Sequence, residues 1–226
     1  MREIEAVAFD IDGTLYPEWK FYCLIFPFIL RHFSLMKAFG KVRREIRQNQ
    51  LRNPDLLQDD FFSFQAKMLS TRLKKNEKEI KALVEEKIYL GWKKVFSKIK
   101  PYKHVVEVIS NLKKRGLKIA LLSDFPPEQK GDVWGVMKYC DVALSSENVG
   151  ALKPSPFPFL FLSKELNVLP EKVLYVGNNM QYDVLGAKSV GMKTALINTY
   201  LFKSFKFQSK VPDIIFSDYR QLLENL

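Results

Sequence analysis

The chain has 226 residues, 47% of them apolar, and 36 basic against 25 acidic side chains give it a formal net charge of +11. This composition excludes a disordered chain and allows either one domain with a large insertion or two small domains. The positive charge favours anionic partners such as phosphorylated metabolites, nucleic acid or acidic lipid headgroups, but it does not choose among them.

The two cysteines, Cys23 and Cys140, are far apart in the sequence and form neither a disulfide framework nor a zinc-binding pattern. The N-terminal segment lacks the apolar core of a signal peptide. Both features favour a cytoplasmic location with a reducing environment. The longest unbroken apolar run, residues 21–30, is shorter than the roughly 20 residues that a membrane-spanning helix needs.

Residues 6–9 form a continuous apolar run that predicts a short buried strand, and Asp10 and Asp12 follow it closely. Ligands bind at the carboxyl ends of strands in open parallel sheets, so both carboxylates can face one crevice. Two acids this close repel each other, which favours either a bound divalent cation or a partly protonated Asp12. An EF-hand calcium loop fits less well, because a strand precedes the motif and Leu15 and Tyr16 follow it.

The stretch from residue 17 to residue 98 breaks the strand pattern and shows helical features. Pro54 stands at a suitable first position of a helix. Asn76 followed by Glu79 resembles a capping box at the start of another helix. Apolar residues at helical spacing extend this second helix: Ile80, Val84, Ile88, Trp92 and Val95. Pro27 is expected to interrupt any long regular helix near the start of the stretch. We therefore predict an all-helical domain here.

After this helical stretch, short apolar runs alternate with helical patterns. Strands are predicted at residues 119–122, 173–176, 194–197 and 214–216, and helices at residues 105–114 and 181–190. Gly116 and Gly191 are the expected helix stops. Such alternation predicts an α/β fold in which helices cover both faces of a parallel sheet. Residues 1–16 and 99–226 would form this domain, and residues 17–98 the helical one.

Four segments with polar residues at the ends of predicted strands, or between them, occur in a fixed order. They are residues 9–15, residues 121–124, Lys153 within residues 150–154, and residues 176–183. In this order they resemble the four motifs of the haloacid dehalogenase-like hydrolase superfamily, and the resemblance covers nearly the whole chain outside the helical stretch. That family folds as a Rossmann-like parallel sheet with a cap, and an insertion directly after the first motif is similar to the helical cap of its first subclass.

The resemblance implies a magnesium-dependent phosphatase that acts on a small phosphorylated metabolite. Asp10 would attack phosphorus and form an aspartyl-phosphate, while Asp12 would act as general acid and then general base. Ser123, Asp124 and Lys153 would lie at the substrate, with Lys153 also holding the charge of Asp10. The residues expected to bind Mg²⁺ are Asp10, Asp12 through its backbone carbonyl, Asn178 and Asp183.

The sequence departs from the family pattern at two places. Asn178 stands where the last motif usually has an aspartate, so the metal site would have at most two direct carboxylates, Asp10 and Asp183. An amide oxygen still binds magnesium but carries no charge, so we expect weaker metal affinity rather than no site. Asp124 stands where asparagine is common. A third acid near a phosphate site is unfavourable unless it faces away or is neutralised.

Other functions stay open. A 2-haloacid dehalogenase would use Asp10 on carbon without a metal. Asp12 argues against it, because those enzymes usually have no acid two residues after the nucleophile, whereas Asn178 leans towards it. A degenerate member that acts by binding would also explain Asn178, although the residues that match the other motifs are present. A phosphotransferase or phosphomutase would pass the phosphoryl group to another acceptor.

The apolar run of residues 21–30 is followed by a strongly basic stretch. Its basic residues are Arg31, Lys37, Lys41, Arg43, Arg44, Arg47 and Arg52. A solvated basic face is the simplest interpretation. The alternative is a contact through the cap with a second copy of the chain or with an anionic membrane. Residues 201–207 interleave aromatic residues with lysines, as single-stranded nucleic-acid sites do. The family has a loop near the active-site face there, so we favour a substrate-side or packing role and no nucleic-acid partner.

Overall fold

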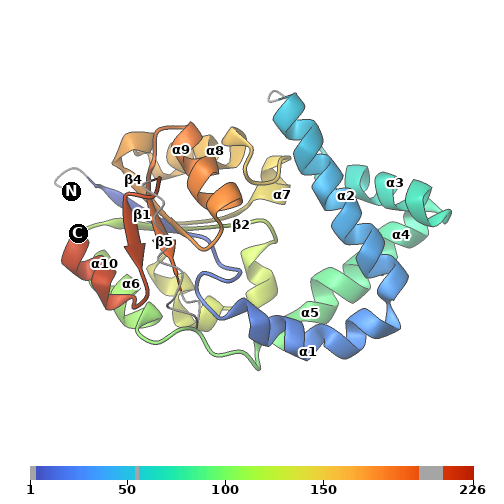
Figure 1. The fold of residues 1–226 in the computed structure, drawn as a ribbon, viewed down its shortest axis with the longest axis horizontal. Coiled ribbons are helices and arrows are strands. Elements are labelled where there is room, and N and C mark those ends of the chain that lie inside the picture. Colours follow the sequence, from blue (N-terminus) through green and yellow to red (C-terminus); the bar gives the residue numbers. More distant parts are fainter. Residues whose placement is uncertain (1–3, 54–55, 199–210) are drawn as a thin grey trace.

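The computed structural model describes residues 4–53, 56–198 and 211–226. Within these residues a parallel sheet has the strand order β3-β2-β1-β4-β5-β6. The strands are β1 (Ala6–Phe9), β2 (Lys118–Ser123), β3 (Val142–Ser145), β4 (Val173–Gly177), β5 (Lys193–Ile197) and β6 (Ile214–Phe216). Helices cover both faces of the sheet (Figure 1). The predicted α/β architecture is therefore confirmed.

Alternate side chains of β1 enter two apolar clusters on opposite faces of the sheet. The helices that cover these faces are α6 (Val105–Lys114), α8 (Pro156–Leu166), α9 (Leu185–Ser189) and α10 (Arg220–Asn225). Val7 and Phe9 belong to the cluster with α6 and α10, whereas Ala6 and Ala8 belong to the cluster with α8 and α9. Because β1 is buried on both faces, its position in the sheet is fixed, and so is the position of Asp10, the residue that follows it.

The register of β1 with its two neighbours places the strand ends at one edge. Phe9 pairs with Leu121 of β2 and with Val176 of β4, and the N–H of Asp10 donates to the carbonyl of Val176 at 2.9 Å. The segments that follow β2 and β4 therefore flank Asp10. This is the edge at which parallel sheets bind ligands.

Between β1 and α6 the described residues form a series of helices, called the helical insertion below. Its helices are α1 (Glu18–Arg31), α2 (Phe33–Arg52), α3 (Phe61–Leu73), α4 (Glu77–Val84), the π-helical η1 (Glu85–Leu90) and α5 (Gly91–Phe96). The side chain of Asn76 accepts hydrogen bonds from the N–H groups of Lys78 and Glu79 at 2.9 and 3.4 Å. The predicted N-terminal cap of helix α4 at Asn76 is thus confirmed. The helix predicted after it is formed by α4, η1 and α5, with a π-helical segment in its middle.

Two details of the helical insertion differ from the sequence prediction. Pro27 does not interrupt α1 but lies inside it. Proline cannot donate to the carbonyl four residues earlier, but that residue, Cys23, is exposed and its carbonyl can bond to water. The break falls instead at His32, where α1 and α2 meet at a bend of 116°. The next helix begins at Phe61, and Pro54 itself lies outside the described residues.

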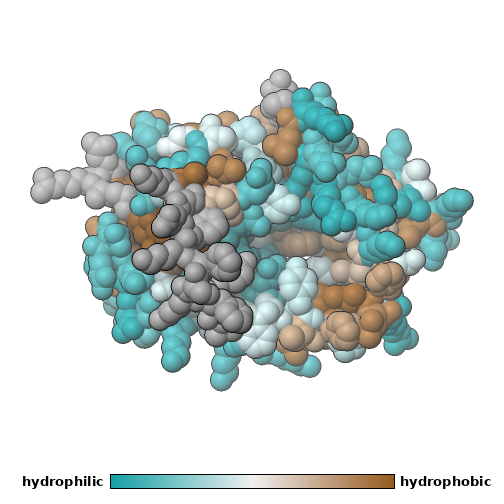
Figure 2. Space-filling view, viewed as in Figure 1, coloured by the Kyte–Doolittle hydropathy of each residue, from teal (hydrophilic) through white to brown (hydrophobic). Residues whose placement is uncertain are grey.

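Helix α1 exposes several large apolar or aromatic residues, and hydrophobic residues gather in a brown region of Figure 2 where this helix runs. The exposed residues are Trp19, Tyr22, Leu24, Phe26 and Leu30. Within the described part of the chain, no single helix is long and apolar enough to cross a membrane, and α1 with α2 meets the criterion only as a bent pair. Contact of this surface with a second copy or a membrane stays a prediction. Residues 201–207 lie outside the described residues.

Candidate active site

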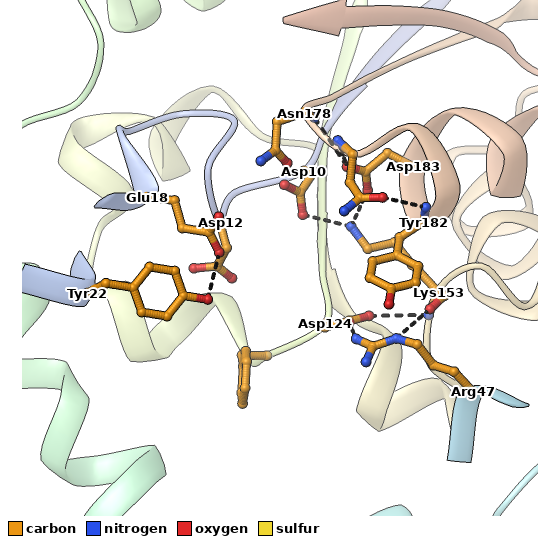
Figure 3. A pocket seen from close by; sticks show the side chains of 12 residues that line it. Asp10, Asp12, Glu18, Tyr22, Arg47, Asp124, Lys153, Asn178, Tyr182 and Asp183 are labelled. Carbon is orange, nitrogen blue, oxygen red and sulfur yellow. Dashed lines mark hydrogen bonds and ion pairs between the residues drawn. The ribbon is translucent and has the colours of Figure 1, made fainter. Parts of the chain in front are cut away.

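A cavity of about 250 Å³ opens at the carboxyl edge of the sheet, between the sheet and the helical insertion. Figure 3 shows the residues around it. Its lining residues are Asp10, Asp12, Glu18, Tyr22, Arg47, Asp124, Phe125, Lys153, Asn178, Asn179, Tyr182 and Asp183. They come from the ends of β1, β2 and β4, from the loop before α8, and from α1 and α2 of the insertion. The cavity therefore contains nearly all the predicted site residues.

Lys153 lies between two carboxylates at the base of the cavity. Its Nζ is 2.7 Å from Asp10 Oδ1 and 2.7 Å from Asp183 Oδ1, and it also donates to the Tyr175 hydroxyl at 3.2 Å. Only 3% of Lys153 is exposed. Burial lowers the pKa of this lysine, but Asp10 and Asp183 outweigh that effect and hold the pKa well above its usual value. Lys153 is therefore a fixed positive charge beside Asp10.

Asp10 is a poor acid in this environment. Burial raises its pKa; Lys153 opposes this, and the nearby Asp183 and Asp12 add to it, so the pKa rises from 3.8 to about 7. The second carboxylate oxygen accepts a hydrogen bond from the Thr14 hydroxyl at 2.7 Å. At neutral pH the carboxyl is consequently poised between its ionised and protonated forms, and any added cation would favour ionisation.

Asp183 is held rigidly by the backbone that follows β4. Its Oδ2 accepts hydrogen bonds from the N–H groups of Asn178 and Asn179 at 3.2 and 3.0 Å. This close approach requires glycine at position 177, since a Cβ there would lie 2.3 Å from the Cβ of Asp183. The sequence from 177 to 183 thus folds into a tight turn that aims Asp183 at Lys153.

Asp12 has its own counter-ion, which the sequence did not indicate. Its Oδ2 lies 3.0 Å from Lys130 Nζ and accepts a hydrogen bond from Ser123 Oγ at 2.8 Å, while its Oδ1 accepts one from the Tyr16 hydroxyl at 2.8 Å. Burial raises the pKa of Asp12, but Lys130 and these hydrogen bonds outweigh burial and lower the pKa below 3.8. Asp12 is therefore ionised in the resting protein.

Asp124, which stands where asparagine is common in the family, lines the cavity and is paired with positive side chains. Its Oδ2 pairs with the Arg47 guanidinium and lies 3.6 Å from Arg43, and its Oδ1 accepts hydrogen bonds from Ser146 and from the Lys153 backbone N–H. Burial raises the pKa of Asp124, but Arg47 and then Arg43 outweigh it and hold the pKa well below its usual value. The negative charge of Asp124 is thus compensated by two arginines of the helical insertion.

Two arginines of α2 face the sheet, whereas the sequence favoured a solvated basic face for the whole stretch. Arg47 Nε donates to the carbonyl of Lys153 at 2.9 Å, and its guanidinium lies 4.5 Å from the centre of the Tyr182 ring. Arg43 is buried and pairs with Glu147. The solvated-face interpretation is therefore wrong for these two residues, because buried acids of the α/β domain compensate their charge.

The donor atoms suit a hard divalent cation. Asp10 Oδ2 and Asn178 Oδ1 both lie near Thr14 Oγ1, at 2.7 and 3.3 Å, and magnesium prefers such oxygen ligands. Five lining residues of the cavity are acidic and two are basic, so an anionic substrate would need an added cation there. Asp183 would have to release Lys153 or a backbone N–H to bind a metal directly. Within the described residues, acidic, histidine and cysteine side chains form no metal-binding group of three.

The site thus has a buried carboxylate, Asp10, beside the ammonium group of Lys153 at the carboxyl edge of a parallel sheet, the arrangement that the sequence resemblance implied. The chain belongs to the haloacid dehalogenase-like hydrolase family, whose model matches residues 4–191. The resemblance inferred from the sequence is therefore confirmed.

Relatives named as a phosphatase and as a dehalogenase both match nearly the full chain. A phosphoglycolate phosphatase of Aquifex aeolicus (strain VF5) is 28% identical and covers 98% of each chain. A haloacetate dehalogenase H-2 of Moraxella sp. (strain B) is 27% identical over 94% of this chain and 93% of its own. The crystal structure of a HAD phosphatase from Thermococcus onnurineus has a TM-score of 0.61 at 25% identity, covering 98% and 97% of the two chains.

Proposed function

We propose that this hydrolase cleaves phosphate monoesters of small organic molecules through an aspartyl-phosphate on Asp10. Residues 1–16 and 99–226 would form the catalytic core and residues 17–98 its cap. The observation that carries the proposal is Asp12, which faces the same cavity as Asp10. An alcohol leaves a phosphate ester only with a proton, whereas a halide leaves carbon as a stable anion and needs none. A second acid at the nucleophile therefore suits phosphate esters.

In the proposed reaction a carboxylate oxygen of Asp10 attacks phosphorus and the bond to the ester oxygen breaks. The leaving oxygen takes a proton that Lys130 Nζ, 3.0 Å from the ionised Asp12, supplies through the Asp12 carboxylate. Water then attacks the phosphorus, its proton passes through Asp12 to Lys130, and release of phosphate restores Asp10. Lys153 and Arg47 would stabilise the phosphoryl charge. When held by Asp10, Asn178 and the Asp12 carbonyl, Mg²⁺ would offset the repulsion between nucleophile and phosphate.

The test is a pair of assays on the same preparation. We expect phosphate release from p-nitrophenyl phosphate in the presence of magnesium, and loss of that activity when magnesium is chelated. Chloride release from a 2-chloro acid, without any phosphatase activity, would replace the proposal by its alternative. Two observations favour that alternative: the neutral Asn178 in the last motif and a dehalogenase among the relatives.

The pH dependence of hydrolysis should report the ionisation of Asp10. Only the carboxylate form can attack phosphorus, and burial raises the pKa of this group to about 7. At limiting magnesium, kcat/KM should therefore rise roughly tenfold per pH unit below pH 7 and level off above it. The second ionisation of a phosphate ester lies near pH 6. A rise centred at that lower pH, with no change near 7, would show that the substrate rather than Asp10 sets the profile.

A further inference from the structure

A second cavity, of about 230 Å³, continues from the active site into the helical insertion. The two cavities share five lining residues, which are Asp12, Glu18, Tyr22, Arg47 and Phe125. They are therefore neighbouring compartments of one hollow, with Asp12 in the wall of both. The first compartment is lined mainly by charged and amide side chains. The second lies between α1, α2 and α5.

Most of the wall of the second compartment is apolar and tightly packed, and its polar residues are Asp12, Glu18, Arg43, Arg47 and Gln129. Its side chains include Phe21, Ile25, Met36, Phe39, Trp92 and Phe96. The Phe21 ring stacks on Phe96 at 4.9 Å between centroids and meets Trp92 edge-on at 5.1 Å. An apolar cavity of about 150 Å³ is large enough for benzene. The compartment can therefore take an aromatic ring or a short alkyl chain without rearrangement.

Gly40 keeps this compartment open. Met36, Gly40, Arg43 and Arg47 follow one another at helical spacing along α2, and all four line the compartment. A Cβ added at Gly40 would meet no atom within 4 Å. Glycine inside a helix is destabilising relative to alanine. Because Gly40 has no side chain, space is left where α2 faces the compartment. This space is available to a bound group.

We propose that the apolar compartment binds the organic part of the substrate, so that the preferred substrates are phosphate monoesters of apolar alcohols or phenols. The inference rests on the proposed phosphatase function, in which Asp12 protonates the leaving oxygen. Because Asp12 borders both compartments, that oxygen lies at their junction. The phosphoryl group then occupies the polar compartment beside Asp10 and Lys153, and the carbon skeleton extends into the apolar one.

A series of n-alkyl phosphates from ethyl to hexyl tests this, since their leaving groups have similar intrinsic reactivity. Each buried methylene group contributes about fourfold, so the four additional methylene groups of hexyl phosphate should raise kcat/KM over that for ethyl phosphate by roughly 250-fold. Hydrolysis of the whole series with a ratio near one would overturn the inference and leave the phosphatase proposal intact. If no ester is hydrolysed, the phosphatase proposal fails, and calorimetric binding of ethyl and hexyl phosphonate still decides whether the compartment takes alkyl chains.

A substitution in the wall ties the chain-length effect to this compartment. Gly40→Leu should fill the space and lower the hexyl-to-ethyl ratio about tenfold or more, and Gly40→Ala should lower it less. Gln48→Leu adds the same side chain at an exposed position of the same helix and should keep the ratio of the unaltered protein. An unchanged ratio in a Gly40→Leu protein that folds normally by circular dichroism would place the alkyl chain elsewhere and refute the assignment.

Discussion

Replacement of Asp10 by asparagine is expected to lower kcat/KM for p-nitrophenyl phosphate by about 10,000-fold or more. The amide has the size of the carboxyl group, but its single oxygen can accept from only one of Thr14 and Lys153, which donate to different oxygens of Asp10 at 2.7 Å. It cannot act as an oxygen nucleophile at phosphorus, so the covalent route is closed. Phosphate release at saturating magnesium measures the effect.

A second measurement separates the nucleophile from a residue that only binds. Protein quenched in acid during turnover of a ³²P-labelled ester should carry a covalent label, and Asp10→Asn should carry none. Thr14→Val is the matched control, because it removes a hydrogen bond to Asp10 but leaves the carboxylate. It should retain labelling. A labelled Asp10→Asn protein, or one with a few per cent of full activity, would mean that another group or water attacks phosphorus.

The strands could be predicted wherever both faces of the sheet are covered. β1, β2, β4 and β5 are short runs of apolar residues, and their central residues are buried. The edge strand β3, whose Val142, Ala143 and Leu144 are only partly buried, was missed, whereas the other edge strand, β6, was predicted at residues 214–216 from a run of the same length, two of whose residues are buried. The helix at 105–114 was predicted to the residue, because Gly116 supplies the positive φ that follows its end.

The candidate site was predictable where it follows the strands and, through the family resemblance alone, at Lys153 in the loop before α8. Asp10, Asp12 and Asp183 belong to motifs at strand ends, and parallel strands bring such ends to one edge. Lys130 and Arg47 were missed for a different reason. Lys130 lies in a short helical turn after β2, and Arg47 belongs to a run of basic residues that resembles a solvated surface. Their partners, Asp12 and Asp124, are distant in the sequence, and no local pattern encodes such pairs.

Lys153→Met should be the most destabilising single change at this site. In the folded protein Lys153 is buried between Asp10 and Asp183, at 2.7 Å from each. Methionine fills a similar volume but leaves two carboxylates facing each other without a cation. Removal of one partner from a buried ion pair costs about 3 kcal/mol or more. We therefore expect the free energy of unfolding in urea to fall by about this amount, and phosphatase activity to be lost.

The double variant Lys153→Met with Asp183→Asn distinguishes charge imbalance from lost packing. The comparison is made at a pH well above the raised pKa of Asp10, where this carboxyl is ionised. The three side chains then sum to a charge of −1, the single variant to −2, and the double variant to −1 again. If unpaired charge causes the instability, the double variant should recover most of the lost free energy of unfolding, although it stays inactive because no ammonium faces Asp10. Equal stability losses in both variants would instead assign the effect to packing around the Lys153 side chain.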